Sequence, residues 1–205
     1  PGKNRSMPSY PLAKKNEGFM DASQVQYVAR AGNYAAHGFS YHGALRILKV
    51  ILGYDYLWIN VRVKGGAYGC MNGYMRNGDT YFVSYRDPNL SATNEIYDGI
   101  PAYLEKFDAD EREMTGYIIG TISNIDRPMN PSAKGTRSMN LYMNHVTEEM
   151  IKKEREEILN AGQEEIRALA DVVAAMLAAD QLCVIGSEEK IEEQKALFDE
   201  VRTLF

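Results

Sequence analysis

Alternating and helically spaced apolar residues divide the first part of this chain into a strand, a helix and a turn. Residues 24–30 alternate apolar and polar side chains, which is the period of a half-buried strand. Residues 40–61 repeat apolar side chains at helical spacing with few polar positions, so they predict a helix buried on most sides. Gly53 inside this helix predicts a close packing contact or a bend. Gly65 and Gly66 then supply the backbone freedom on which helices commonly end.

A β-hairpin follows, because Asn77-Gly78 stands between two alternating runs. A two-residue loop would place Tyr74 opposite Tyr81. The face that this register predicts to be polar holds Tyr68, Cys70, Asn72, Tyr74, Tyr81, Val83 and Tyr85. The opposite, smaller face, which suits a covering helix, holds Ala67, Gly69, Met71, Gly73, Phe82 and Ser84. The polar face fits a surface or a chamber wall, and partly buried packing of its tyrosines is the alternative.

The rest of the chain completes a mixture of helices and strands. Residues 1–17 have no periodicity and contain Pro8 and Pro11, so we expect an extended lead-in before one domain at 18–205. The later elements predicted are helices over 91–107 and 110–125, a mobile loop over 132–137, a long helix over 147–180, a strand over 182–185 and an amphipathic helix over 188–205. This order predicts an α+β fold, an α/β sandwich in which helices pack on a mixed β-sheet.

The composition and net charge limit the classes of binding partner that we expect. The 205 residues are 45% hydrophobic and 25% charged, as in an ordinary globular domain. The net charge of -5 predicts no nucleic-acid partner and no anionic membrane partner. Neither an apolar run long enough to cross a bilayer nor a targeting signal is present, so we expect a cytoplasmic protein. Cys70 and Cys183 lie in predicted strands without C-x-x-C spacing, which favours buried free thiols over a disulfide.

The residues provide no complete catalytic centre. His145 begins a segment within one residue of H-x-x-E-H, but Glu149 stands where the second histidine would be needed, so we predict no metal site. There is no G-x-S-x-G motif. The glycine cluster follows a helix and lacks a Walker ending, so a phosphate cradle is not expected. Arg62 and Tyr68, on either side of the glycine turn, remain as donors for a carbonyl oxygen or an oxyanion. Their alternatives are a helix-end cation and a sheet aromatic.

Three segments are more specific than their periodicity. They are Tyr41-His42-Gly43-Ala44-Leu45-Arg46, Asp55-Tyr56-Leu57-Trp58 and Val61-Arg62-Val63-Lys64-Gly65-Gly66-Ala67-Tyr68-Gly69. Together they resemble the C-terminal half of insulinase-type zinc metallopeptidases, and most of all the presequence-protease branch. The segments 85–90 and 182–186 extend this resemblance over nearly the whole chain.

The resemblance implies a peptidase of four similar domains, arranged as two halves that close around a chamber. The N-terminal half carries zinc on an H-x-x-E-H motif, and the C-terminal half has lost that motif. By motif position, Arg62 and Tyr68 would be the catalytic residues that bind the scissile carbonyl, with Gly65 and Gly66 at the substrate. The implied partners are the N-terminal catalytic half and unstructured peptides. Zinc belongs to the parent enzyme, and this chain alone would hold no cofactor and show no activity.

Two other functions remain open for a chain of this fold. One is a non-catalytic structural subunit, and the other is a stand-alone peptide-binding module. The presence of both Arg62 and Tyr68 at the motif positions favours a domain still used in catalysis, because a structural relic has no need of the pair.

Overall fold

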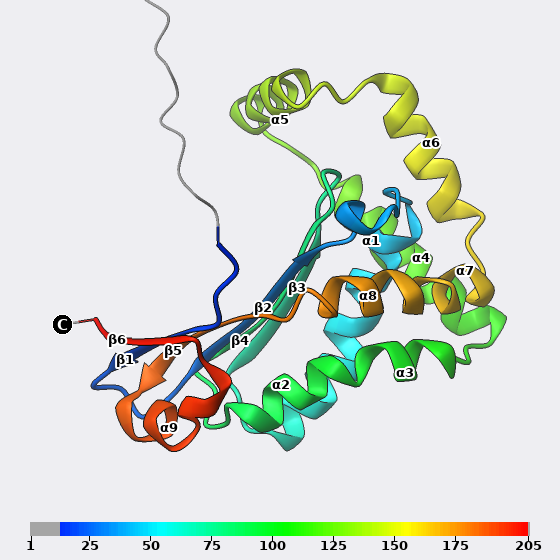
Figure 1. Cartoon of the computed structure of the whole chain (residues 1–205). Coiled ribbons are helices and arrows are strands. Elements are labelled where there is room, and N and C mark those ends of the chain that lie inside the picture. Colours follow the sequence, from blue (N-terminus) through cyan, green and yellow to red (C-terminus); the bar gives the residue numbers. More distant parts are fainter. Residues whose placement is uncertain (1–12, 205) are drawn as a thin grey trace, which may run out of the picture.

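A computed structural model describes residues 13–204. A six-stranded β-sheet lies at the centre of the fold (Figure 1). Its strands are β1 (Glu17–Asp21), β2 (Tyr27–Asn33), β3 (Gly69–Tyr74), β4 (Asp79–Tyr85), β5 (Gln181–Ser187) and β6 (Glu200–Thr203). Their order is β3-β4-β2-β5-β1-β6. β1 runs parallel to β5 and β6, whereas the other neighbours are antiparallel. The predicted α+β class with a mixed sheet is therefore confirmed.

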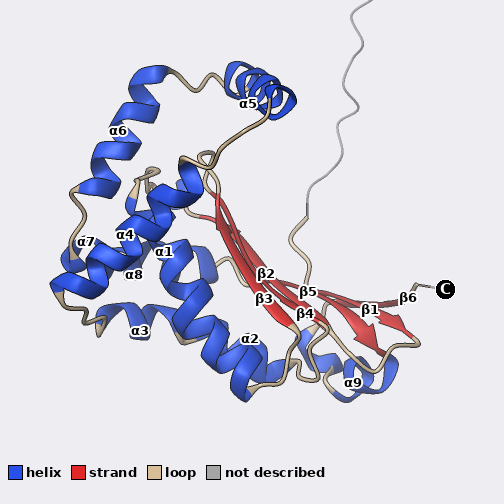
Figure 2. Cartoon of the chain, turned by 180° about the vertical axis from the view of Figure 1, so that it is seen from behind, coloured by secondary structure: helices blue, strands red, loops and turns tan. Residues whose placement is uncertain are grey.

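The nine helices of the described part of the chain gather mostly on one face of this sheet, whereas one of them stands apart beyond the end of the strands (Figure 2). They are α1 (Ala44–Ile51), α2 (Ser91–Asp98), α3 (Ile100–Glu105), α4 (Glu111–Ile125), α5 (Pro131–Met143), α6 (Glu148–Leu159), α7 (Gln163–Arg167), α8 (Leu169–Leu177) and α9 (Glu188–Glu193). Burial alternates along β2 and β4, because one side of each strand meets the helices and the other side does not.

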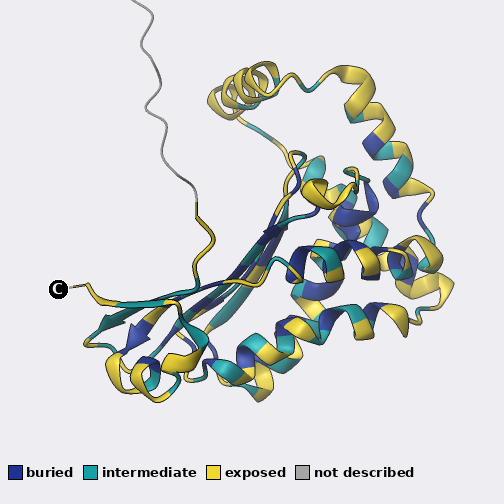
Figure 3. Ribbon diagram, in the orientation of Figure 1, coloured by how far each residue is buried: buried dark blue, intermediate teal, exposed yellow. Residues whose placement is uncertain are grey.

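The core lies between α1, α3, α8 and the covered face of the sheet. α1 buries five apolar side chains, and Phe82 and Val184 meet the helices from the strands with no exposed surface. Figure 3 shows the buried residues concentrated there, whereas α5 is exposed along its length. Burial of this amphipathic surface is the main force that holds the helices on the sheet.

The hairpin register differs by one residue from the prediction. Gly73 lies opposite Tyr81, because the loop between Met75 and Asp79 has three residues. The Met75 N–H donates to the Asp79 carbonyl at 2.8 Å, and Gly78 takes a φ of 97°. A three-residue loop with glycine in the left-handed region is a common alternative to the two-residue turn.

The shift reverses the predicted faces of β3. Cys70, Asn72 and Tyr74 point toward the helices, and Met71 and Gly73 belong to the open face. The prediction for β4 is correct, since Phe82 is buried and Tyr85 is exposed. The predicted polar wall therefore does not exist as described, and the open face is a mixture of apolar and aromatic side chains.

Several element boundaries were also wrong. The predicted loop at 132–137 lies inside α5, because the Asn130 side chain caps the helix at the Ala133 N–H and Pro131 suits its first turn. The predicted helix at 147–180 is broken near Gly162 and again at Ala168, which gives α6, α7 and α8.

The two ends of the chain hold strands that the periodicity did not predict. The helix predicted over 188–205 ends at Glu193 as α9, and β6 follows as an edge strand beside β1. β1 was not predicted and begins at Glu17, inside the expected lead-in. The rest of that lead-in, residues 1–12, lies outside the described residues.

Candidate functional site

The helix that leads to the glycine turn changes its winding halfway. After α1, the segments Leu52–Tyr56 and Trp58–Lys64 are π-helical, a form that is rare and frequent at functional sites. A Cβ on Gly53 would meet only the Asn72 Nδ2 atom, at 3.8 Å, so the predicted close contact is absent and the change of winding takes its place. The prediction of burial on most sides fails here, because Tyr54 is 70% exposed.

Gly65 and Gly66 end this helix as predicted. Gly66 has a φ of 82°, which an L side chain rarely adopts. The Gly66 N–H donates to the Arg62 carbonyl at 3.0 Å, and the Ala67 N–H donates to the Val61 carbonyl at 3.1 Å. The carbonyls of Val61 and Arg62 are thus satisfied by backbone amides, without the side chain of Arg62.

The loop after β4 braces the glycine turn. The Asn89 Nδ2 group donates to the Gly65 carbonyl at 2.6 Å. The buried carboxylate of Asp87 accepts hydrogen bonds from the Asn89 N–H at 2.9 Å and from the Thr93 hydroxyl at 2.7 Å. Asp87 and Gln26 also exchange backbone hydrogen bonds of 2.7 and 2.8 Å. The turn is therefore tied to β2 and α2 through one loop.

Arg62 stands on the exposed side of the π-helical segment. Its guanidinium carbon lies 3.9 Å from the centroid of the Trp58 ring, a cation–π contact. The arginines of the described residues that form ion pairs are Arg30, Arg46, Arg76, Arg155, Arg167 and Arg202. Within residues 13–204, Arg62 therefore keeps its charge and donors available to a ligand.

Tyr68 lies on the far side of the turn. Its side chain is 68% exposed, and its ring meets the edge of Tyr85 with 5.9 Å between centroids. The Tyr68 N–H donates to the Tyr85 carbonyl at 3.1 Å. The prediction that Tyr68 belongs to an open face is correct, but for a different reason. The chain is irregular between Gly66 and Gly69, so the alternation of β3 does not apply to Tyr68.

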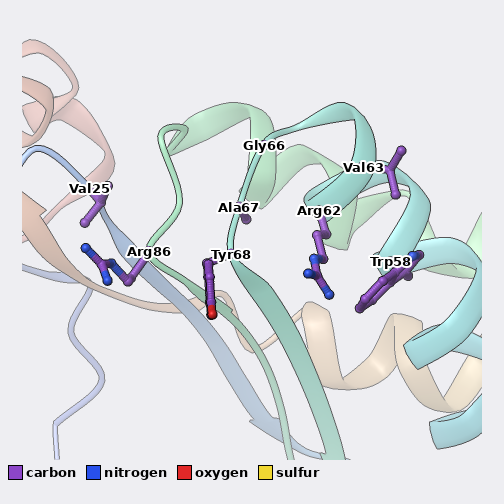
Figure 4. Close-up of a pocket in the computed structure, with 8 residues that line it drawn as sticks. All are labelled: Val25, Trp58, Arg62, Val63, Gly66, Ala67, Tyr68 and Arg86. Carbon is purple, nitrogen blue, oxygen red and sulfur yellow. The ribbon is translucent and has the colours of Figure 1, made fainter.

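Arg62 and Tyr68 line the same open hollow of about 610 Å³. Its wall consists of Val25, Trp58, Arg62, Val63, Gly66, Ala67, Tyr68 and Arg86 (Figure 4). Gly65 is not part of the wall and acts from behind it as the end of the helix. Arg86 was not predicted from the sequence. The sequence places it in the segment 85–90 that extends the resemblance, just before the turn Asp87-Pro88-Asn89, but gives it no role.

The charge of Arg62 affects the pKa of the nearby Cys70 thiol. Burial raises the pKa of Cys70, and Arg62 partly opposes this by stabilising the thiolate. The thiol is therefore neutral at pH 7 and is not an activated nucleophile. Both Cys70 and Cys183 are free, as predicted, but they are half-buried and not buried.

The histidines do not add a metal centre to this site. His42 Nδ1 accepts a hydrogen bond from the Ala44 N–H at 3.1 Å, beside the start of α1. Across residues 13–204, histidine, cysteine, aspartate and glutamate nowhere gather in a group of three that could hold a metal ion. In the same part of the chain, no helix combines the length and the apolarity needed to span a membrane.

Sequence relatives connect this geometry to a family. A profile of the PreP C-terminal domain matches residues 16–188. Protein HypA of Clostridium perfringens is 50% identical over 196 residues, which are 96% of this chain and 20% of that protein. Presequence protease 1, chloroplastic/mitochondrial, of Arabidopsis thaliana is 33% identical over 195 residues, 93% of this chain and 18% of that protein. The chain thus spans about a fifth of the length of these relatives.

Solved structures show the same fold. The inactive domain of a peptidase M16 from Pseudomonas fluorescens matches 91% of this chain and 47% of its own, with a TM-score of 0.62 and 14% identity. Pitrilysin matches 84% of this chain and 19% of its own, with a TM-score of 0.57 and 12% identity. With a profile match over most of its length and the fold of an M16 inactive domain, this chain belongs to the PreP C-terminal domain family.

Proposed function

We propose that this chain is the zinc-less C-terminal domain of a metallopeptidase that degrades unstructured peptides inside a closed chamber. In this proposal Arg62 and Tyr68 bind the carbonyl of the scissile bond, and the N-terminal catalytic half supplies zinc. The observation that carries it is the glycine turn, which holds the guanidinium of Arg62 and the exposed phenol of Tyr68 on one hollow.

The described residues do not fit zinc, because no group of three ligands comes together in this part of the chain. The contribution of the chain is therefore limited to binding and charge stabilisation. The carbonyl oxygen gains negative charge when its carbon is attacked, and the Arg62 N–H groups and the Tyr68 O–H donate to that oxygen. Removal of one such donor typically costs about 2.7 to 4 kcal/mol of transition-state stabilisation.

Trp58 and Gly66 prepare this arrangement. The Trp58 ring supports the guanidinium of Arg62 and limits its rotamers. Gly66 presents only backbone to the hollow, so a peptide main chain can approach closely. The substrate would then lie across the turn, with the open face of the sheet beside it.

The test is a kinetic comparison in the complete natural protein that contains this chain. Arg62→Ala and Tyr68→Phe are each expected to lower kcat about 100-fold or more, with circular dichroism and thermal midpoint unchanged. Tyr54→Phe is the matched control, since Tyr54 is 70% exposed on the same helix but outside the hollow. Near-normal kcat values in both site variants would refute the assignment.

The isolated chain provides a second test. Because the described residues lack a metal group, the purified chain should not cleave unstructured peptides in the presence of zinc. Cleavage that is lost on adding a chelator and regained with zinc would overturn the proposal that catalysis needs another part of the protein.

A further inference from the structure

Arg86 faces the hollow from the side opposite to Arg62. Figure 4 shows Tyr68 between the two guanidinium groups, with Trp58 beyond Arg62 and Val25 beside Arg86. Among residues 13–204, these two arginines are the only charged residues in the wall of the hollow. They create a local positive field on a chain whose net charge is -5.

The backbone of Arg86 is held in an unfavourable conformation. Its φ of 50° lies in the left-handed region, where a residue with a Cβ is uncommon. Such a conformation persists only when the surroundings enforce it, and it occurs often at binding sites. Arg86 is exposed, so the burial of its own side chain does not explain the conformation.

The neighbours of Arg86 supply the constraint. Asp87 has no exposed surface and is fixed by the Thr93 hydroxyl and by the backbone of Gln26. On the other side, the Tyr68 N–H approaches the Arg86 carbonyl at 3.4 Å. The chain must therefore turn at Arg86, and the side chain lines the edge of the hollow beside Val25 (Figure 4).

The chemistry of this side chain selects a ligand. A guanidinium offers a planar fork of donors that matches the two oxygens of a carboxylate. Within residues 13–204, Arg86 forms no ion pair with an acidic side chain. A neutral peptide carbonyl needs hydrogen-bond donors only around its oxygen. The proposed function assigns these donors to Arg62 and Tyr68. A second cation across the hollow adds affinity for a charged group next to the cleaved bond.

We propose that Arg86 is a specificity residue that binds a carboxylate of the substrate peptide, and this inference rests on the proposed function. The carboxylate is either an acidic side chain near the scissile bond or the C-terminus of a short peptide. Peptides that carry it are then cleaved with a higher kcat/KM than neutral peptides of the same sequence.

Two peptide pairs test this in the complete natural protein. One pair differs by Glu or Gln at a position beside the cleaved bond, and the other has a free or an amidated C-terminus. The wild-type protein should prefer one carboxylate by about tenfold in kcat/KM, as a charge-assisted hydrogen bond gives. A preference in the first pair identifies the side chain as the source, and a preference in the second identifies the C-terminus.

Variants then connect the preference to Arg86. Arg86→Gln should abolish it, so that both members of each pair are cleaved with equal kcat/KM, whereas Arg86→Lys should keep part of it. Arg112→Gln is the matched control, an exposed arginine on α4 outside the hollow. Equal cleavage within both pairs by the wild type, or an unchanged preference in Arg86→Gln, would overturn the inference.

The outcomes also separate this inference from the proposed function. If Arg62→Ala is slow on every peptide but Arg86→Gln keeps the preference, only the carboxylate site is wrong. If the wild type cleaves none of the four peptides, or Arg62→Ala cleaves them normally, the proposed function fails and the carboxylate site fails with it.

Discussion

Thr93→Val tests whether the buried carboxylate of Asp87 holds the loop that braces the glycine turn. Thr93 is 1% exposed, and its hydroxyl donates a hydrogen bond to the Asp87 Oδ2 atom at 2.7 Å. Both hydrogen bonds from Asn89 go to the other oxygen, Oδ1. Valine has nearly the same shape as threonine, so the substitution removes one donor without leaving a cavity.

The expected loss follows from the charge and burial of the acceptor. A hydrogen bond to a charged group contributes about 1.5 to 3 kcal/mol, and an unsatisfied buried acceptor costs a similar amount. Thr93→Val should therefore lower the free energy of unfolding by about 1.5 to 3 kcal/mol. In urea, where small domains have slopes of about 1 to 3 kcal/mol/M, the midpoint should fall by roughly 1 M with an unchanged slope.

Thr121→Val is the matched control. Thr121 is 2% exposed, and its hydroxyl donates to the Tyr117 carbonyl four residues earlier in α4, at 2.8 Å. Such a bond adds little to a helix, so the loss should stay below about 1 kcal/mol. The single tryptophan, Trp58, lies in the wall of the hollow and reports unfolding by fluorescence. Equal losses in the two variants would refute the role assigned to Asp87.

Two further predictions concern the turn and the pH range of stability. A Cβ on Gly65 would lie 2.5 Å from the Val61 carbonyl oxygen, so Gly65→Ala should destabilise by about 1 to 3 kcal/mol. Gly116→Ala, in open space on α4, should stabilise by up to about 1 kcal/mol, and the reverse order of urea midpoints would contradict this. Burial raises the pKa of Tyr34 to about 12, so its contribution to stability is complete below pH 10 and is lost as the pH rises through 12. Stability of the wild type should fall more steeply between pH 10 and 12 than that of Tyr34→Phe, and parallel curves would exclude this cause.

The sequence predicted the fold class and the glycine turn, because these depend on local signals. Helical spacing and a Gly-Gly pair are visible without knowledge of the rest of the molecule. The hairpin register was wrong because Asn77-Gly78 fits both a two-residue and a three-residue loop. The local pattern predicts a loop in place of α5, since Asn130-Pro131 is equally a break and a good helix start.

The candidate site was predictable in part for the same reason. Arg62 and Tyr68 lie close in the sequence on either side of one turn, and the structure places both on the hollow. Arg86 arrives from the end of β4, and its direction depends on a positive φ enforced by the packing of Asp87. No local pattern encodes that conformation, because a non-glycine residue normally avoids it. The π-helical winding also depends on tertiary contacts and left no signal in the spacing.

The brace between Asn89 and the Gly65 carbonyl has a consequence for the entropy of binding. The backbone between Arg62 and Tyr68 is already ordered in the folded chain, by hydrogen bonds that end the helix and join Tyr68 to β4. A ligand that touches both side chains therefore does not have to immobilise a loop, and loop ordering is a cost that otherwise subtracts from affinity. Whatever binds in this hollow meets a spacing that was set when the protein folded.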